Sequence, residues 1–183
     1  MRDSVFNPNL MRNMLAAAVL FFSLVGCSGT GLQLSNDGLT RAPAFTALAL
    51  DGRPVALSEY AGKVVLLDFS ASWCSGCRQS LPHLQSLHDD QLLGAKGLVV
   101  LAIDEEEDAS TVKSFAESTG CSLPVLLDSD RSIGADYHAN SLPTSVIIGR
   151  DGTVRAVISG WTQQSAQQVS DAVNAALAEP IRQ

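Results

Sequence analysis

Short apolar runs of strand length alternate along this chain with segments whose apolar residues recur at helical spacing. Residues 64–69 and 98–103 are almost continuous apolar runs, which is typical of buried strands. Two Asp-Gly pairs, at 51–52 and 151–152, each separate two further short runs and predict hairpins. The runs of the two hairpins are 45–50 with 55–57 and 145–148 with 154–158, and residues 123–127 form another short β segment.

Helical spacing follows the first of the two central runs. Leu81, Leu84 and Leu87 recur on one face, Leu92 is a candidate for the same row, and the row predicts a helix that begins near Cys74. Three further helices are predicted, over 104–119 with a solvated acidic start, over 132–137 and over 166–178. Strands and helices in this order predict an α/β fold in which helices flank a mixed central β-sheet.

The N-terminal part of the chain has a targeting pattern. Residues 14–26 form an apolar run preceded by Arg12, too short to span a bilayer but typical of a secretory signal. The run ends in Leu-Val-Gly-Cys at 24–27, which resembles the lipobox of bacterial lipoproteins and implies lipidation of Cys27. An ordinary signal peptide remains the alternative, and Met11 is a second candidate for the start.

These features predict three regions: a lipoprotein signal peptide (1–26), a flexible tether (27–42) and one folded domain (43–183). Ser28 stands where an aspartate would resemble an inner-membrane retention signal, so an outer-membrane anchor facing the periplasm is favoured. The net charge of −7 and the lack of a basic cluster make nucleic acid an improbable partner.

Residues 74–77, Cys-Ser-Gly-Cys, lie at the predicted strand-to-helix junction. The start of a helix offers unpaired N–H groups and a positive dipole end, which favour a thiolate at Cys74. The i,i+3 spacing places Cys77 within reach of a disulfide to Cys74. A structural zinc site would need a second ligand pair, and Cys27, Cys121 and three histidines are not paired in that way. The pair therefore predicts redox chemistry and no metal.

Residues 66–78, LLDFSASWCSGCR, resemble the active-site segment of thioredoxins. The first hairpin, the later Leu-Pro-Thr at 142–144 and the Asp-Ser-Asp at 128–130 resemble the exported TlpA/ResA-like branch of that family. The resemblance covers about residues 42–178. It implies a thioredoxin-like fold with an N-terminal β-hairpin extension, thiol–disulfide oxidoreductase activity and no cofactor.

The resemblance also implies roles for individual residues. Trp73 would shield the thiolate and present an apolar surface to substrate, unless it only packs. Pro143 would be cis beside the disulfide, exposing the Leu142 backbone to an extended substrate, with a trans turn proline as the alternative. Asp68 would be buried, with a raised pKa, and would act as base for Cys77, whereas a solvated carboxylate would have no such role.

The implied function is an exported protein-disulfide reductase. Protein disulfides, apocytochrome c among them, would be its substrates, and a membrane protein of the DsbD/CcdA type would supply electrons. Three departures from the family pattern leave the direction of electron flow open: Ser80 replaces a common glutamate, Ser70 an aromatic residue, and the dipeptide between the cysteines is Ser-Gly.

Two other functions are compatible with the same fold. A copper-binding protein of the Sco type usually has three residues between its cysteines, and this chain has Ser75 and Gly76 alone. A peroxiredoxin would need a Pro-x-x-x-Thr-x-x pattern before its cysteine, which residues 70–73 lack. Of the remaining candidates, Cys121 is expected to be a half-buried structural thiol and His138 a surface residue.

Overall fold

A computed structural model of the chain describes residues 41–105 and 108–180. The predicted signal peptide (1–26), Cys27 and the tether up to residue 40 lie outside the described residues. At the start of the described part, Arg41 forms an isolated β-bridge with Thr153, and the Ala42 N–H donates to the Gly152 carbonyl at 2.9 Å. These two residues already pair with the second hairpin.

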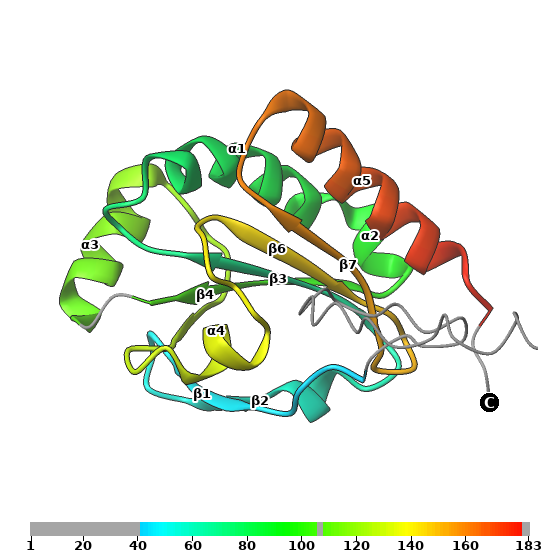
Figure 1. The fold of residues 1–183 in the computed structure, drawn as a ribbon, viewed down its shortest axis with the longest axis horizontal. Helices are drawn as coiled ribbons and strands as arrows, with labels where there is room; N and C mark the ends of the chain where they lie inside the picture. Colours follow the sequence, from blue (N-terminus) through cyan, green and yellow to red (C-terminus); the bar gives the residue numbers. More distant parts are fainter. Residues whose placement is uncertain (1–40, 106–107, 181–183) are drawn as a thin grey trace, which may run out of the picture. The chain divides into compact units, whose positions relative to one another are not determined.

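A seven-stranded mixed sheet forms the centre of the domain, in the order β2-β1-β5-β4-β3-β6-β7 (Figure 1). Its strands are β1 (Thr46–Ala49), β2 (Pro54–Ala56), β3 (Val64–Ser70), β4 (Leu98–Asp104), β5 (Val125–Leu127), β6 (Thr144–Ile148) and β7 (Val154–Ser159). Central strand β3 pairs in parallel with β4 and antiparallel with β6, and all of its residues are buried. The N-terminal hairpin joins the sheet through β1, which pairs with β5. The predicted mixed sheet with an N-terminal hairpin is confirmed.

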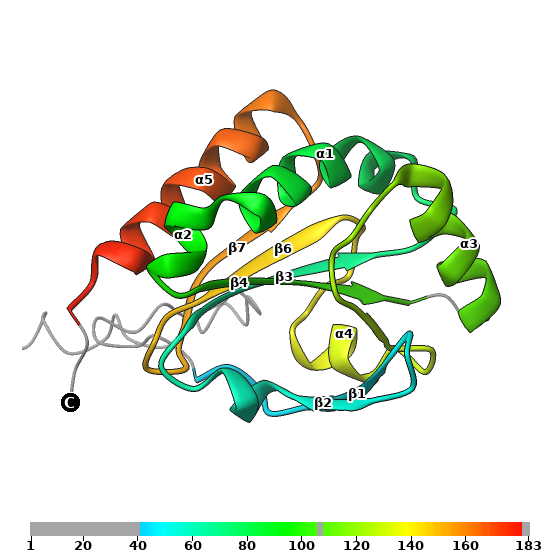
Figure 2. The same cartoon turned by 180° about the vertical axis from the view of Figure 1, so that it is seen from behind.

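Helices α1, α2 and α5 cover one face of the sheet, and α4 lies on the opposite side (Figures 1 and 2). The helices are η1 (Leu57–Tyr60, a 3-10 turn), α1 (Ser75–Asp89), α2 (Gln91–Ala95), α3 (Ala109–Thr119), α4 (Ser132–Asp136) and α5 (Gln163–Ala178). No helix in the described part of the chain combines the length and the apolar character that a bilayer crossing requires.

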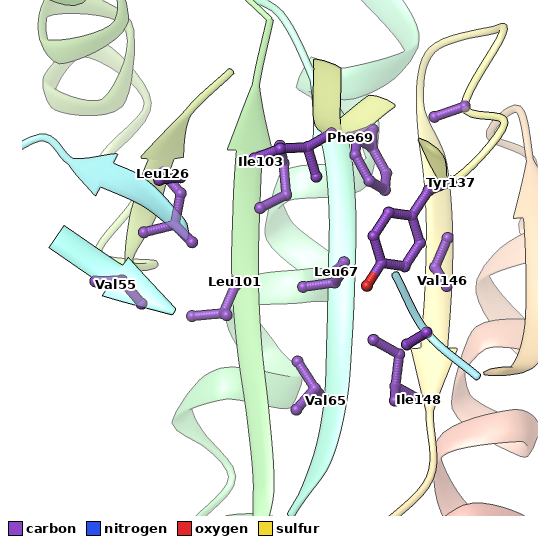
Figure 3. Close-up of a cluster of buried hydrophobic side chains, with 14 residues drawn as sticks. Val55, Val65, Leu67, Phe69, Leu101, Ile103, Leu126, Tyr137, Val146 and Ile148 are labelled. Atoms are coloured by element: carbon purple, nitrogen blue, oxygen red, sulfur yellow. The ribbon is translucent and has the colours of Figure 1, made fainter. Parts of the chain in front are cut away.

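Side chains along β3 alternate between two buried clusters, as the pleat of a strand requires. Leu67 and Phe69 pack with Tyr137 in the cluster on the α4 side, shown in Figure 3. Leu66 packs on the other face, among side chains of α1, α3 and α5. By the same alternation, Asp68 points to the face that α1 covers.

Two local expectations were wrong. Leu92 does not continue the row on α1, because the Asp90 side chain accepts from the N–H groups of Leu92 and Leu93 and starts the separate helix α2. The side chain of Leu92 is accordingly 74% exposed. The acidic run at 104–108 is not a solvated helix start throughout: Asp104 ends β4 and Glu105 follows it, and both are buried. Asp108 caps α3, on the exposed surface.

Candidate active site

The two cysteines of the Cys-x-x-Cys motif form a disulfide at the start of α1. Cys74 is the N-cap residue of the helix, its Sγ accepts from the Cys77 N–H at 3.1 Å, and the two Cα atoms are 5.3 Å apart. Cys77 is fully buried, whereas Cys74 keeps 6% of its surface exposed. Cys74 is therefore the less buried of the two cysteines, and it lies at the helix end where a thiolate is stabilised.

A cis peptide bond lies beside this disulfide. The bond joins Leu142 to Pro143, as expected from the resemblance. Leu142 is half-buried and packs against a small cluster of Ala71 and the two cysteines. A Cβ atom built on Gly76 would lie 3.1 Å from Pro143 Cδ, so the Cys-x-x-Cys turn and the proline ring are in close contact. The fold thus unites two motifs that are far apart in the sequence.

Trp73 precedes the reactive cysteine and is largely exposed. Its side chain keeps 63% of its surface accessible, which is high for a residue of its size. This exposure argues against a purely packing role, because a packing tryptophan would bury most of its ring. Its contact with substrate remains a prediction.

Asp68 is buried in β3, with 1% of its surface exposed. Burial raises the pKa of its carboxyl group from 3.8 to about 7, and a hydrogen bond from the Ser145 hydroxyl to Oδ1, at 2.7 Å, lowers that pKa in part. Oδ2 is also buried and has no hydrogen-bond partner among the described residues. The solvated alternative is therefore excluded, and a carboxyl group that titrates near neutral pH is suited to accept a proton. Its role as base for Cys77 remains a prediction.

The two serines that replace bulkier family residues are both buried. The Ser80 hydroxyl donates to the Cys77 carbonyl at 2.9 Å, so the side chain folds back onto its own helix. Ser70 and Asp104 line a small cavity of about 20 Å³, together with apolar residues, Thr119 and Cys121. The cavity lies where the sequence has a small residue in place of an aromatic one.

Two residues that sequence reasoning placed outside the redox centre have ordinary surroundings. Cys121 is a half-buried free thiol, and burial is the main reason that its pKa is raised. His138 is exposed. Within residues 41–105 and 108–180, no group of three or more His, Cys, Asp or Glu side chains is arranged to hold a metal ion.

Sequence reasoning missed Trp161, which lies next to the redox centre. Its Cβ atom is 4.0 Å from the Cβ position of Gly76, between the two cysteines. The preceding residue, Gly160, donates its N–H to the Pro143 carbonyl at 2.8 Å. No periodic pattern marks Trp161, and the one available signal was that the chain has only two tryptophans.

A thioredoxin-like sheet with a Cys-x-x-Cys disulfide at a helix start and a cis proline beside it defines the thiol–disulfide oxidoreductases. The model of the AhpC/TSA family matches residues 39–157, and the chain belongs to this family. It is 29% identical to the thiol-disulfide oxidoreductase ResA of Bacillus thuringiensis subsp. konkukian, over 88% of this chain and 96% of the relative. The relatives named thiol-disulfide oxidoreductases, together with the Cys74–Cys77 disulfide, assign thiol–disulfide oxidoreductase activity to this chain.

Solved structures show the same relationship. A putative thiol:disulfide interchange protein DsbE from Chlorobium tepidum aligns with a TM-score of 0.71 and 30% identity, over 75% of this chain and 96% of that one. The exposed lipoprotein thioredoxin Etrx1 of Streptococcus pneumoniae aligns with a TM-score of 0.64 and 27% identity, over 73% of this chain and 99% of that one.

Proposed function

We propose that this oxidoreductase is an exported, lipid-anchored reductase of protein disulfides. The observation that carries the proposal is the buried Cys74–Cys77 disulfide, which opens α1 and packs against the cis bond before Pro143. Cys74 is less buried than Cys77, as suits a two-step exchange in which Cys74 meets the client first. The backbone of Leu142 would pair with the extended client segment that carries the disulfide.

The reaction is a pair of thiol–disulfide exchanges. In the reduced enzyme, the Cys74 thiolate attacks one sulfur of the client disulfide, forms a mixed disulfide and releases the other client sulfur as a thiol. Cys77 then attacks the Cys74 sulfur, so that the Cys74–Cys77 bond forms and the second client thiol leaves. The client gains two electrons from the cysteine pair and takes up two protons. One of these protons comes from Cys77 and the other from solvent, because Cys74 enters the reaction already ionised.

Asp68 would remove the proton from Cys77 in the second step. It points to the sheet face that α1 covers, and its carboxyl group has a pKa of about 7. A buried carboxylate in this range can take the proton at neutral pH and release it later. The unpartnered Oδ2 is the atom available for that transfer.

Export and anchoring are supported by the N-terminal sequence. The apolar run 14–26 ends at Cys27 in a lipobox-like pattern, and Ser28 favours the outer membrane over the inner membrane. One similar solved structure is described as an exposed lipoprotein. In such a compartment the reduced pair must be regenerated, so a membrane electron donor of the DsbD/CcdA type is the proposed partner and apocytochrome c a candidate client.

The reduction potential of the Cys74–Cys77 couple tests the direction of this reaction. We expect a value of about −270 mV, at the thioredoxin end of the scale, from equilibration of the chain from Ser28 onward with dithiothreitol. A value of about −120 mV, at the DsbA end, would make the protein an oxidant and would refute the reductase proposal. In a separate assay of client reduction, the Cys74→Ser variant is the control, because this substitution should abolish the activity.

A further inference from the structure

The link between β7 and α5 is fixed onto the cis-proline segment. Ser159, the last residue of β7, pairs with Thr144, and Gly160 then donates its N–H to the Pro143 carbonyl at 2.8 Å. Thr162 caps α5 by accepting from the Ser165 N–H at 3.1 Å. Trp161 is held between these two anchored points, so its backbone position is set by the sheet and by the helix.

This placement brings Trp161 against the turn that carries the cysteines. The Cβ atom of any other residue at position 76 would lie 3.1 Å from Pro143 Cδ and 4.0 Å from Trp161 Cβ. Because glycine has no Cβ atom, the turn can lie close to both residues. The other tryptophan of the chain, Trp73, adjoins the same turn through Cys74. Both tryptophans of the protein therefore border the disulfide, one exposed and one half-buried.

The indole of Trp161 contacts a histidine ring that two helices hold in place. The His83 ring, on α1, lies 5.5 Å from the Trp161 ring, centroid to centroid, with an angle of 50° between the planes. Nε2 of His83 is 3.1 Å from the Ser170 hydroxyl on α5, so both helices hold the imidazole. A ring that is held in this way loses little entropy when a ligand packs on it, which is a property of binding anchors.

We propose that Trp161, with Trp73 and Pro143, forms an apolar contact surface for the residue two positions from the client cysteine. The enzyme would then prefer clients with an aromatic or large aliphatic side chain at that position. An extended client paired with the Leu142 backbone turns alternate side chains to the same side, so the residue two positions from its cysteine comes onto the indoles. This inference rests on the proposed reduction of protein disulfides and names the client chemistry.

The chemistry of the surface around Trp161 favours an apolar client side chain. The residues of this surface carry no charge: Trp73, Trp161, Leu142, Pro143 and Gly76. An apolar side chain that binds there therefore removes no water from a charged group. Tryptophan rings stack on aromatic and aliphatic groups and contribute strongly at the centres of interfaces. A client with a charged residue two positions from its cysteine would gain none of this contact.

The experiment compares disulfide-linked peptides that differ only in the residue two positions after the reactive cysteine: Phe, Leu or Ser. The reduced full chain should reduce the Phe and Leu peptides with a higher kcat/KM than the Ser peptide. Trp161→Ala should lower kcat/KM for the Phe peptide about three- to tenfold, through KM, and should remove the preference. Trp161→Phe should restore most of it. Hydroxyethyl disulfide is too small to reach the indole, so the wild type, Trp161→Ala and Trp161→Phe should reduce it at the same rate.

Matched variants separate binding from folding. Leu48→Ala removes an exposed apolar side chain from β1, 54% accessible, and should change no peptide rate. As a test of positioning, His83→Ala should weaken the Phe preference and His83→Phe should retain it.

Three results would overturn the inference. If Trp161→Ala lowered kcat/KM equally for hydroxyethyl disulfide and for the peptides, the role of Trp161 would be structural. Peptide turnover by the wild type without any preference would refute the client chemistry and leave the reductase proposal standing. Turnover of hydroxyethyl disulfide but of no peptide would refute both.

Discussion

Asp68 shows how the burial of one carboxyl group can oppose stability. A carboxylate in a fully buried strand has lost its hydration, and the single hydrogen bond from Ser145 replaces only part of it. The pKa of Asp68 rises to about 7 as a consequence. Burying an ionisable group costs free energy that an apolar residue would not cost. Groups of this kind therefore concentrate at functional sites.

This pKa makes the stability of the oxidised protein dependent on pH. Between pH 4 and pH 7 the folded state holds a proton on Asp68 that the unfolded state has released, so the free energy of unfolding falls as pH rises. The shift from 3.8 to about 7 corresponds to roughly 4 kcal/mol. We expect Asp68→Asn to be near neutral at pH 4 and stabilising by up to about that amount at pH 8, measured by urea unfolding at both pH values.

Ser145→Ala is the control for this prediction. Loss of the hydroxyl that donates to Asp68 should raise the pKa further, because that hydrogen bond favours the ionised form. The loss of stability with rising pH should then extend above pH 7. An Asp68→Asn protein with the same pH dependence as the wild type would contradict the assignment.

The same carboxyl group predicts the pH profile of the second exchange step. A base must be deprotonated to act, so the rate at which Cys77 resolves the mixed disulfide should rise with pH and level off above about 7. Asp68→Asn should slow this step about 10²- to 10⁴-fold near pH 7 and remove the inflection. Single-turnover release of a labelled client measures it. An inflection that persists in the variant would assign the titration to another group.

At the scale of elements, the positions of strands and helices were predictable where the pattern was long. The continuous apolar run that became β3 is typical of a strand buried on both faces, and the leucine row of α1 is typical of a helix that buries one face. The errors were local. The helical row was extended to Leu92 across Asp90, a cap residue that starts a new helix. The acidic run was taken as one solvated unit although it begins within β4, where the neighbouring strands bury Asp104.

One contact between elements carries a testable coupling. Arg155 lies on β7, and its Nε donates at 2.6 Å to Oε1 of Glu179, which follows the last residue of α5. The Arg155 guanidinium also covers Gly149. A Cβ atom at position 149 would meet Arg155 Cζ at 2.6 Å. We expect Gly149→Ala to displace the guanidinium and to cost about 1 kcal/mol, a value kept small because Glu179 is 39% exposed. Urea midpoints of the variants measure the cost.

A double-mutant cycle isolates this coupling. In an Arg155→Ala background the guanidinium is gone, and Gly149→Ala should become neutral or stabilising by up to about 1 kcal/mol, because alanine restricts the unfolded chain. The backbone of Gly149 does not require a positive φ, so alanine fits there. Equal costs in both backgrounds would show that the clash with Arg155 is not the cause.

At the scale of the whole molecule, the site combines segments from three parts of the chain. The turn at 73–77 and the cis bond at 142–143 were predictable, since each has a local motif that resembles a known family. The contact of Trp161 was not, because it depends on the pairing of β6 with β7, which places Gly160 beside the Pro143 carbonyl. The burial of Asp68 was predictable from its apolar neighbours, whereas its partner Ser145 lies on another strand.

The net charge of the whole chain bears on the proposed anchor. At −7, the protein is repelled by anionic lipids, so attraction to headgroups cannot hold it at a membrane. Acyl chains bind through buried methylene groups, at about 0.8 kcal/mol each, and this attraction is insensitive to salt. We therefore expect the full chain to stay in the membrane fraction through a high-salt wash and to be released by detergent.

Cys27→Ser separates the anchor from the catalyst. If Cys27 carries the lipid, the variant should lose the added mass and appear in the soluble fraction, with unchanged peptide-disulfide reduction, because the described fold begins at Arg41 and the cysteine pair lies within it. Fractionation, intact-mass measurement and the reduction assay on one preparation give all three results. A Cys27→Ser protein that remains in the salt-washed membrane fraction would assign the attachment to the apolar run 14–26, and would refute lipidation as the means of anchoring.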